Sequence, residues 1–189
     1  MRPRWQMAMG VAAMVLLAGC STPSVVEAWP NPQSNIASIY DYGAGGRDLR
    51  LIVRGNPLPM PDDAFNRMIE TDVQGPVMRQ PTHPTLTPGA SAQPNYALIF
   101  DFSSSPRPTP DQICQYPGNA PAGQVASGGD VHVVGAFCVS GRAYTGAMGR
   151  AGADGVAQVS QLMPQMMMAL FRPDLPDSPG GSGGASDQH

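Results

Sequence analysis

Few side chains in this chain could carry out chemistry, and they lie far apart in the sequence. They are three cysteines and three histidines: Cys20, Cys114, Cys138, His83, His132 and His189. No two histidines have the spacing of metal ligands, and no cluster of cysteines or carboxylates accompanies them. The pattern therefore predicts no metal site and no bound cofactor.

Asp130 and His132 come closest to a catalytic pair. Side chains two positions apart point to the same side of a strand, so a dyad is conceivable; a histidine near solvent at the edge of a hairpin is the other interpretation. The serines form no Gly-x-Ser-x-Gly elbow. We expect a protein that is not an enzyme, and a hydrolase that uses His132 is the catalytic alternative.

Four methionines, Met163, Met166, Met167 and Met168, crowd one predicted helix. Thioether sulfurs are soft ligands that suit Cu(I). Successive helical residues point about 100° apart, so the last three cannot converge on one ion. Met163 and Met166 also fall on the apolar stripe of the helix, and we therefore expect this Met-rich helix to pack into the core.

All 11 basic residues are arginines, which excludes chemistry that needs a lysine, such as Schiff-base formation. Arg50 and Arg54 share one face of a predicted strand, where they could meet a phosphate or a carboxylate; a solvated face is the simpler interpretation. The 14 acidic residues leave a net charge of −3. An acidic balance without clustered cations argues against nucleic acid as a partner.

The first 20 residues have the order of a targeting segment. Arg2 and Arg4 form a short positive region, and residues 7–17 form an uncharged apolar run, shorter than the about 20 residues that span a bilayer. The run ends at residues 17–20 in the sequence Leu-Ala-Gly-Cys. This segment closely resembles a bacterial lipoprotein signal peptide with its lipobox.

The resemblance implies that residues 1–19 are removed and that Cys20 receives acyl chains such as palmitate. Where related lipoproteins carry aspartate after the cysteine, they tend to stay at the inner membrane; Ser21 therefore favours the outer membrane, facing the periplasm. Each buried methylene adds about 0.8 kcal/mol, so two or three chains hold a protein on a membrane firmly.

Cys114 and Cys138 remain, and an even pair in an oxidising periplasm predicts a disulfide. A redox site or a metal pair would be the alternatives, but no Cys-x-x-Cys and no further ligands are present. The chain-entropy model gives about 3 kcal/mol or a little more for closing a loop of this length.

The remaining pattern predicts an α+β domain over residues 47–172. Strands are expected over residues 47–54, 96–102, 131–139 and 142–148, the last weakened by Gly146 and Gly149, and helices over 61–75 and 154–171, the second kinked or divided at Pro164. The expected fold is a small mixed or antiparallel sheet of about four strands, with two helices on one face and long Pro/Gly-rich loops. A lipidated cysteine and flexible tether (20–46) precede it, and a disordered tail (173–189) follows.

This layout resembles small, uncharacterised α+β lipoproteins of the bacterial envelope. The similar stretches are residues 95–102, residues 137–149, and Ala169-Leu170-Phe171 before Pro173; the inserted Arg172 and the long Cys-bearing loop depart from that pattern. This resemblance implies a fold and no activity.

These observations favour a lipid-anchored periplasmic lipoprotein that acts as a non-catalytic accessory or structural interaction module in the cell envelope. Its expected partners are the membrane, through lipid on Cys20, and another envelope protein, but no nucleic acid. A small-ligand or metal-binding lipoprotein is the alternative function.

Overall fold

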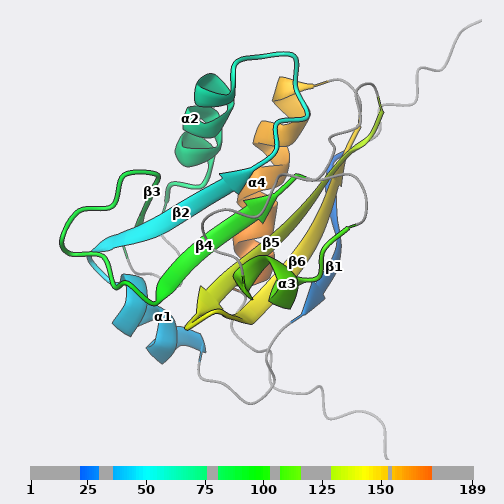
Figure 1. Ribbon diagram of the computed structural model, residues 1–189. Helices are drawn as coiled ribbons and strands as arrows, with labels where there is room; N and C mark the ends of the chain where they lie inside the picture. The colour runs from blue at the N-terminus through cyan, green and yellow to red at the C-terminus, as the bar shows by residue number, and fades with distance from the viewer. Residues whose placement is uncertain are drawn as a thin grey trace, which may run out of the picture.

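The structure is a computed structural model that describes residues 22–29, 36–75, 81–102, 107–115, 129–152 and 155–171. In these ranges the chain forms one sheet of six strands and four helices (Figure 1). The elements in chain order are β1 (Ser24–Trp29), α1 (Ile36–Ala44), β2 (Asp48–Arg54), α2 (Asp62–Asp72), β3 (His83–Thr85), β4 (Tyr96–Asp101), α3 (Pro110–Gln115), β5 (Val131–Val139), β6 (Arg142–Ala151) and α4 (Val156–Leu170). The predicted signal peptide, Cys20 and the predicted tail lie outside the described residues.

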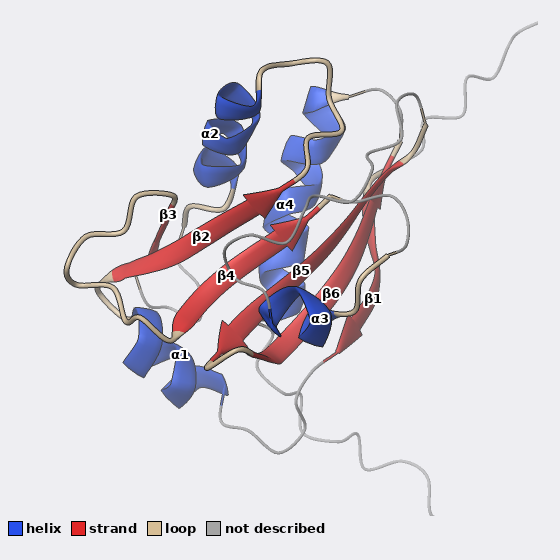
Figure 2. Cartoon of the chain, viewed as in Figure 1, coloured by secondary structure: helices blue, strands red, loops and turns tan. Residues whose placement is uncertain are grey.

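The sheet mixes parallel and antiparallel pairs in the order β1-β6-β5-β4-β2-β3. As predicted, β4 is central, since it runs antiparallel to β5 and parallel to β2. Ser140 and Gly141 close the β5–β6 hairpin with φ values of 51° and 79°, the left-handed conformation that a two-residue hairpin turn requires. The mixed sheet is confirmed, but the expected number of strands was too small, because β1 and the short β3 form its two edges (Figure 2).

The two helices that were predicted, α2 and α4, lie on one face of the sheet as expected, but α3, which was not predicted, covers the other face. Residues of α1, α2 and α4 form the larger core with one face, and α3 forms a smaller core with the other. Figure 1 shows α4 behind the sheet and α3 in front of it. Both sets of alternating side chains along β4 are therefore buried: Leu98 and Phe100 on one face, Ala97 and Ile99 on the other.

The beginning of α2 follows the predicted signals. Pro61 precedes the helix with φ of −59°, and Asp62 and Asp63 occupy its first turn, where acidic side chains favour the positive end of the helix dipole. Phe65 and Ile69, one helical turn apart, are fully buried.

α4 is one helix that continues through Pro164, so the expected division into two short helices is wrong. Proline inside a helix removes one N–H donor and costs about 3 kcal/mol. The opposite side of α4 buries six apolar side chains: Val159, Leu162, Met163, Met166, Met167 and Leu170. Each such burial contributes about 1.5–3 kcal/mol, so packing outweighs the cost of the proline, whose ring is exposed.

Two glycines of the hairpin allow α4 to approach the sheet closely. A Cβ on Gly149 would lie 2.8 Å from Sδ of Met166 and 3.0 Å from Cδ1 and Cδ2 of Leu162. A Cβ on Gly135 would lie 2.9 Å from Cε of Met166 and 2.9 Å from a ring carbon of Phe100. Gly149 was expected to weaken β6, but β6 extends past it to Ala151. Glycine fits at this position because α4 occupies the space that a side chain would fill.

Three segments predicted to be irregular contain structure. The range 20–46, predicted to be a tether, includes β1 and α1, and Tyr40 of α1 is fully buried with its ring 4.5 Å from that of Phe171. The long Pro/Gly-rich loops expected between the helix over 61–75 and the strand over 96–102, and between that strand and the one over 131–139, contain β3 and α3. Each of these elements is held by a partner distant in the sequence, such as β6 for β1, so local composition gave no sign of it.

Candidate functional site

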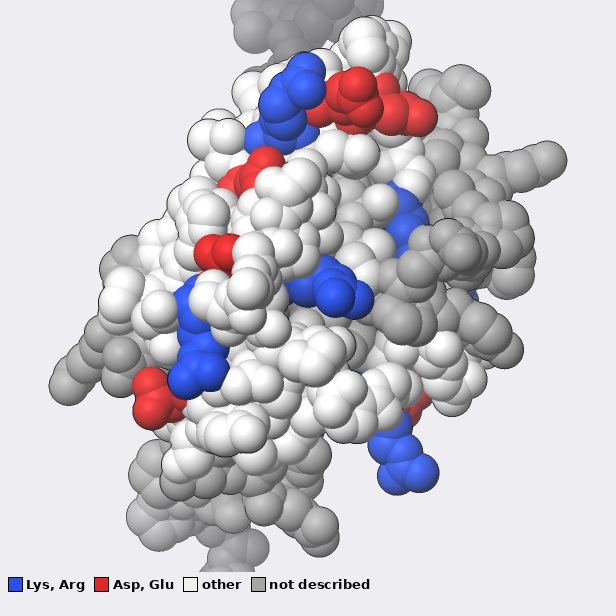
Figure 3. Space-filling view, turned by 60° about the vertical axis from the view of Figure 1, so that its left-hand side comes forward, with Lys and Arg blue, Asp and Glu red and all other residues white. Residues whose placement is uncertain are grey.

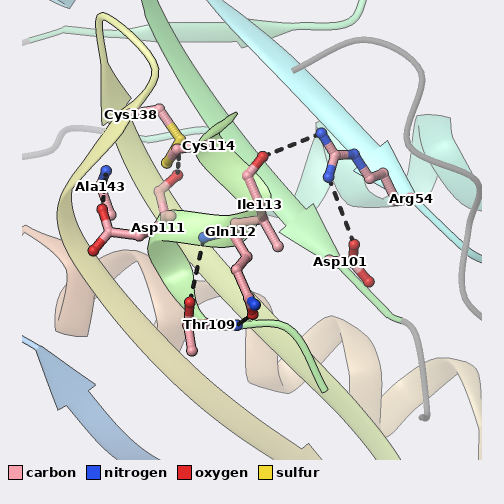
Figure 4. The surroundings of a disulfide bond; sticks show 10 residues. Arg54, Asp101, Thr109, Asp111, Gln112, Ile113, Cys114, Cys138 and Ala143 are labelled. Carbon is pink, nitrogen blue, oxygen red and sulfur yellow. Dashed lines mark hydrogen bonds and ion pairs between the residues drawn. A yellow bond between two sulfur atoms is a disulfide. The ribbon is translucent and has the colours of Figure 1, made fainter. Parts of the chain in front are cut away.

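The face of the sheet under α3 carries the two cysteines predicted to pair. Cys114 lies on α3 and Cys138 on β5; their Cα atoms are 5.5 Å apart and a disulfide joins them (Figure 4). The exposed fractions of the two residues are 0% and 3%. The predicted bridge is thus present, and it fastens α3 to the sheet away from solvent.

Further polar contacts hold this short helix. The backbone N–H of Thr109 donates to Oε1 of Gln112 at 2.7 Å, and the N–H of Gln112 donates to Oγ1 of Thr109 at 3.3 Å, which is the reciprocal pattern of a capping box (Figure 4). Asp111 accepts a bond of 3.0 Å from the N–H of Ala143 on β6. A helix of six residues is unstable alone, so these contacts decide its position.

The side chain of Arg54, the last residue of β2, contacts α3 and is not part of a solvated face. This corrects the expectation for this residue. Its side chain is buried; Nη2 donates to the carbonyl oxygen of Ile113 at 3.2 Å, and Nη1 is 3.8 Å from Oδ2 of Asp101 (Figure 4). Burial lowers the pKa of Arg54, and the nearby Asp101 opposes this effect. Arg50 on the same strand is exposed. The two arginines therefore do not form a common anion-binding surface.

Asp130, considered for a dyad with His132, bonds an arginine instead. Oδ2 of Asp130 accepts hydrogen bonds from Nη2 and Nε of Arg150, the latter at 2.8 Å. Burial, followed by the positive charges of Arg107 and Arg150, lowers the pKa of His132, and Asp130 opposes this only in part. The carboxylate thus orients an arginine, and the imidazole lies in a cationic environment.

A shallow hollow lies beside this cluster. The side chains of Arg107 and His132 line it together with the apolar Val26, Val134 and Met148. The space inside the hollow is about 10 Å³, that of one water molecule, so an anion could contact the cationic side chains at its rim but could not enter it. The sequence analysis missed this grouping, because Val26 reaches it only through the pairing of β1 with β6.

Three of the four methionines of α4 pack into the core, as predicted for Met163 and Met166. Met163 and Met166 are fully buried and Met167 is 6% exposed, whereas Met168 is 65% exposed. The four sulfurs therefore do not share one environment in which they could surround a soft ion.

A second acid–histidine pair was not expected. Nδ1 of His83 is 2.9 Å from Oδ1 of Asp48, whose Oδ2 accepts a bond of 2.8 Å from the N–H of Gly89. These interactions lower the pKa of Asp48, the hydrogen bond from His83 contributing most. The parallel pairing of β2 with β3 places the two residues side by side, a relation that local sequence does not reveal. His83 is largely exposed, and the pair fastens the loop after β3 to the start of β2.

Two further observations concern the kinds of site in the described ranges. No three His, Cys, Asp or Glu side chains there group in a way that could hold a metal ion. None of the helices in those ranges has both the length and the apolar character needed to cross a bilayer. On the face drawn in Figure 3, arginines and acidic side chains lie singly or in small groups between uncharged surface.

The fold and this site define a mixed α+β domain with one six-stranded sheet, a helical layer on one face and a disulfide-fastened short helix on the other. Comparison with protein-family models, with curated proteins and with solved structures finds no match to this chain.

Proposed function

We propose that this chain is a lipid-anchored periplasmic lipoprotein, held in the outer membrane by acyl chains on Cys20, that acts as a non-catalytic accessory or structural interaction module. The observation that carries the proposal is the sequence Leu-Ala-Gly-Cys at residues 17–20 after a positive region and an apolar run. The buried disulfide supports it, because disulfides persist in oxidising compartments and are rare in reducing ones.

The edges of the described sheet support a role in interaction. β1 and β3 are its outermost strands, and an exposed edge is a place where an extended segment of another protein can add a strand. Tyr42 on α1 is 62% exposed beside the half-buried Tyr96, with ring centroids 5.9 Å apart. Aromatic side chains of this kind are common anchors in protein interfaces.

Acylation of the full chain in a bacterial host tests the anchor. Radiolabelled palmitate should enter the protein, and the intact mass of membrane-extracted protein should show acyl chains on Cys20. Cys20→Ala should abolish both signals, whereas the matched variant Cys114→Ala/Cys138→Ala should keep them. An unmodified Cys20, or a soluble product in the parent protein, would contradict the anchor.

Site-directed photo-crosslinking in intact envelopes tests the interaction. A crosslinking residue at Tyr42 should give one discrete adduct, and the same residue at Met168, which is equally exposed on α4, should not give it. The same result at both positions, or no adduct at either, would contradict a specific partner at this surface.

The cationic surface that Arg107 and His132 form beside apolar side chains favours a second candidate, a lipoprotein that binds a small anionic ligand at its surface. A thermal-shift screen with metal ions and cell-wall fragments separates the two functions. A saturable rise of the melting temperature that Arg107→Gln removes would support the ligand-binding function over the structural one.

A further inference from the structure

The position of β1 limits how far the folded domain can lie from an acylated Cys20. Ser24, the first residue of β1, follows Cys20 by four positions. An extended chain covers at most about 3.3–3.6 Å per residue, so this connection reaches about 14 Å. β1 is part of the sheet through its pairing with β6. The acyl chains would therefore hold the sheet itself close to the bilayer, without a long tether between them.

The pairing of the strands shows which end of the sheet this is. Ser24 pairs with Arg150 of β6, and Arg150 pairs with His132 of β5. β2 and β4 also finish at this end, since the last residue of β4, Asp101, pairs with Val134. We call the row Ser24–Arg150–His132 the proximal row. Figure 1 shows β1 beginning where β6 ends and β5 begins.

The proximal row carries the cationic cluster. Arg150, held by Asp130, lies in the row, and the side chains of Arg107 and His132 line the hollow beside it. Among the side chains that the structure describes at this place, the two arginines and one aspartate contribute one net positive charge, although the whole chain carries −3. Val26, 58% exposed, and Met148 complete the hollow with apolar surface.

We propose that in the acylated protein the proximal row lies against the bilayer surface and that the exposed guanidinium of Arg107, at the rim of the hollow beside His132, binds the phosphate of an anionic phospholipid headgroup. The inference rests on the acylation of Cys20 proposed above. A planar guanidinium donates two parallel hydrogen bonds to phosphate oxygens, and anionic leaflets attract basic groups near the surface. Val26 and Met148 would then face the apolar glycerol region, and Tyr42 would lie at the opposite end of the sheet, free for a protein partner.

The histidines allow a direct test with an internal control. His132 lies in the proximal row, and His83 pairs with Asp48 at the opposite end of the sheet, where β2 begins. The full-length acylated protein, with isotope-labelled histidine, is placed in nanodiscs of phosphatidylcholine with or without phosphatidylglycerol. The imidazole signal of His132 should shift and its pKa should rise by about 0.5 with phosphatidylglycerol, because a nearby anion favours the charged imidazole. The signal of His83 should stay constant.

Matched variants identify the residues responsible. Arg107→Gln should remove the response of His132, whereas Arg142→Gln, at the other end of β6, should leave it unchanged. A flexible insertion of about ten residues between Ser21 and Thr22 should weaken the response, because the row is then free to leave the surface. Inorganic phosphate added to phosphatidylcholine discs should produce a smaller shift.

The outcomes separate this inference from the proposed function. A protein without acyl chains in the mass spectrum overturns the anchor and this orientation with it. An acylated protein whose His132 signal ignores phosphatidylglycerol overturns the headgroup site alone. An equal shift with inorganic phosphate assigns the site to a soluble anion and also overturns the headgroup site.

Discussion

Removing the disulfide between Cys114 and Cys138 should lower the free energy of unfolding by about 3.5 kcal/mol. The two cysteines are 24 positions apart, and the chain-entropy model for a loop of that length gives this value at 25 °C. Both positions are buried under α3, so alanine at each also loses some packing. For a domain of this size the melting temperature should fall by about 10 °C.

Urea and thermal unfolding of the parent and of Cys114→Ala/Cys138→Ala, each with and without reductant, measure the effect. Reductant should bring the parent close to the double variant and should not change the double variant itself. The urea m-value should be somewhat larger without the bridge, because the unfolded chain then exposes more surface. A loss below about 1 kcal/mol in the variant would refute the reasoning that this bridge acts through the entropy of the unfolded chain.

Three further changes test other parts of the structure. Gly149→Ala should destabilise the protein by about 1–3 kcal/mol in urea unfolding, because its Cβ would meet α4, whereas Gly129→Ala, with nothing within 4 Å, should have little effect; equal stabilities would contradict the close approach of the helix. Arg54→Met leaves a buried carboxylate without its cation and should cost about 3 kcal/mol by the same measurement; an unchanged midpoint would contradict a stabilising pair. The pKa of Asp48 is lowered in the folded state, so its contribution to stability is present above its ordinary pKa and is lost as the pH falls through the folded value. Urea midpoints at pH values of about 5 and 3 should therefore differ less in Asp48→Asn than in the parent, while an identical difference would show that the pair with His83 is not formed in solution.

The elements predicted correctly have strong local signals. The alternation along β4, the two-residue turn between β5 and β6, and the Pro-Asp-Asp start of α2 all involve residues a few positions apart. Such signals are sufficient to predict an element because they act within it: the period of two in a strand, the left-handed conformation in a turn and the dipole at the start of a helix.

Two of the four elements that were not predicted, α3 and β3, are short and contain proline. α3 has six residues and begins at Pro110, too short to display a helical period, and β3 has three residues with Pro84 in the middle. β1 lies in a stretch rich in proline and serine, and its pairing with β6 holds it in the sheet. Contacts of this kind form only after distant parts of the chain have come together.

Some features of the candidate site could likewise be predicted from the sequence, and others could not. Residue order alone was enough to recognise the cysteine pair, the apolar stripe of α4 and the resemblance to a lipobox. The partners of the charged groups could not. Asp130 bonds Arg150 rather than His132, and Arg54 is covered by α3.

The amino-acid sequence by itself determined the α+β class, the hairpin, the two long helices and the pairing of the last two cysteines, since each follows from spacing along the chain or from counting residues. Only the tertiary structure decided that helices cover both faces, that β1, which begins four positions after Cys20, joins the sheet, and which arginine meets which carboxylate. The physical reason is that strand pairing and burial depend on surfaces brought together from remote segments, and their energies are not encoded in any short window of residues.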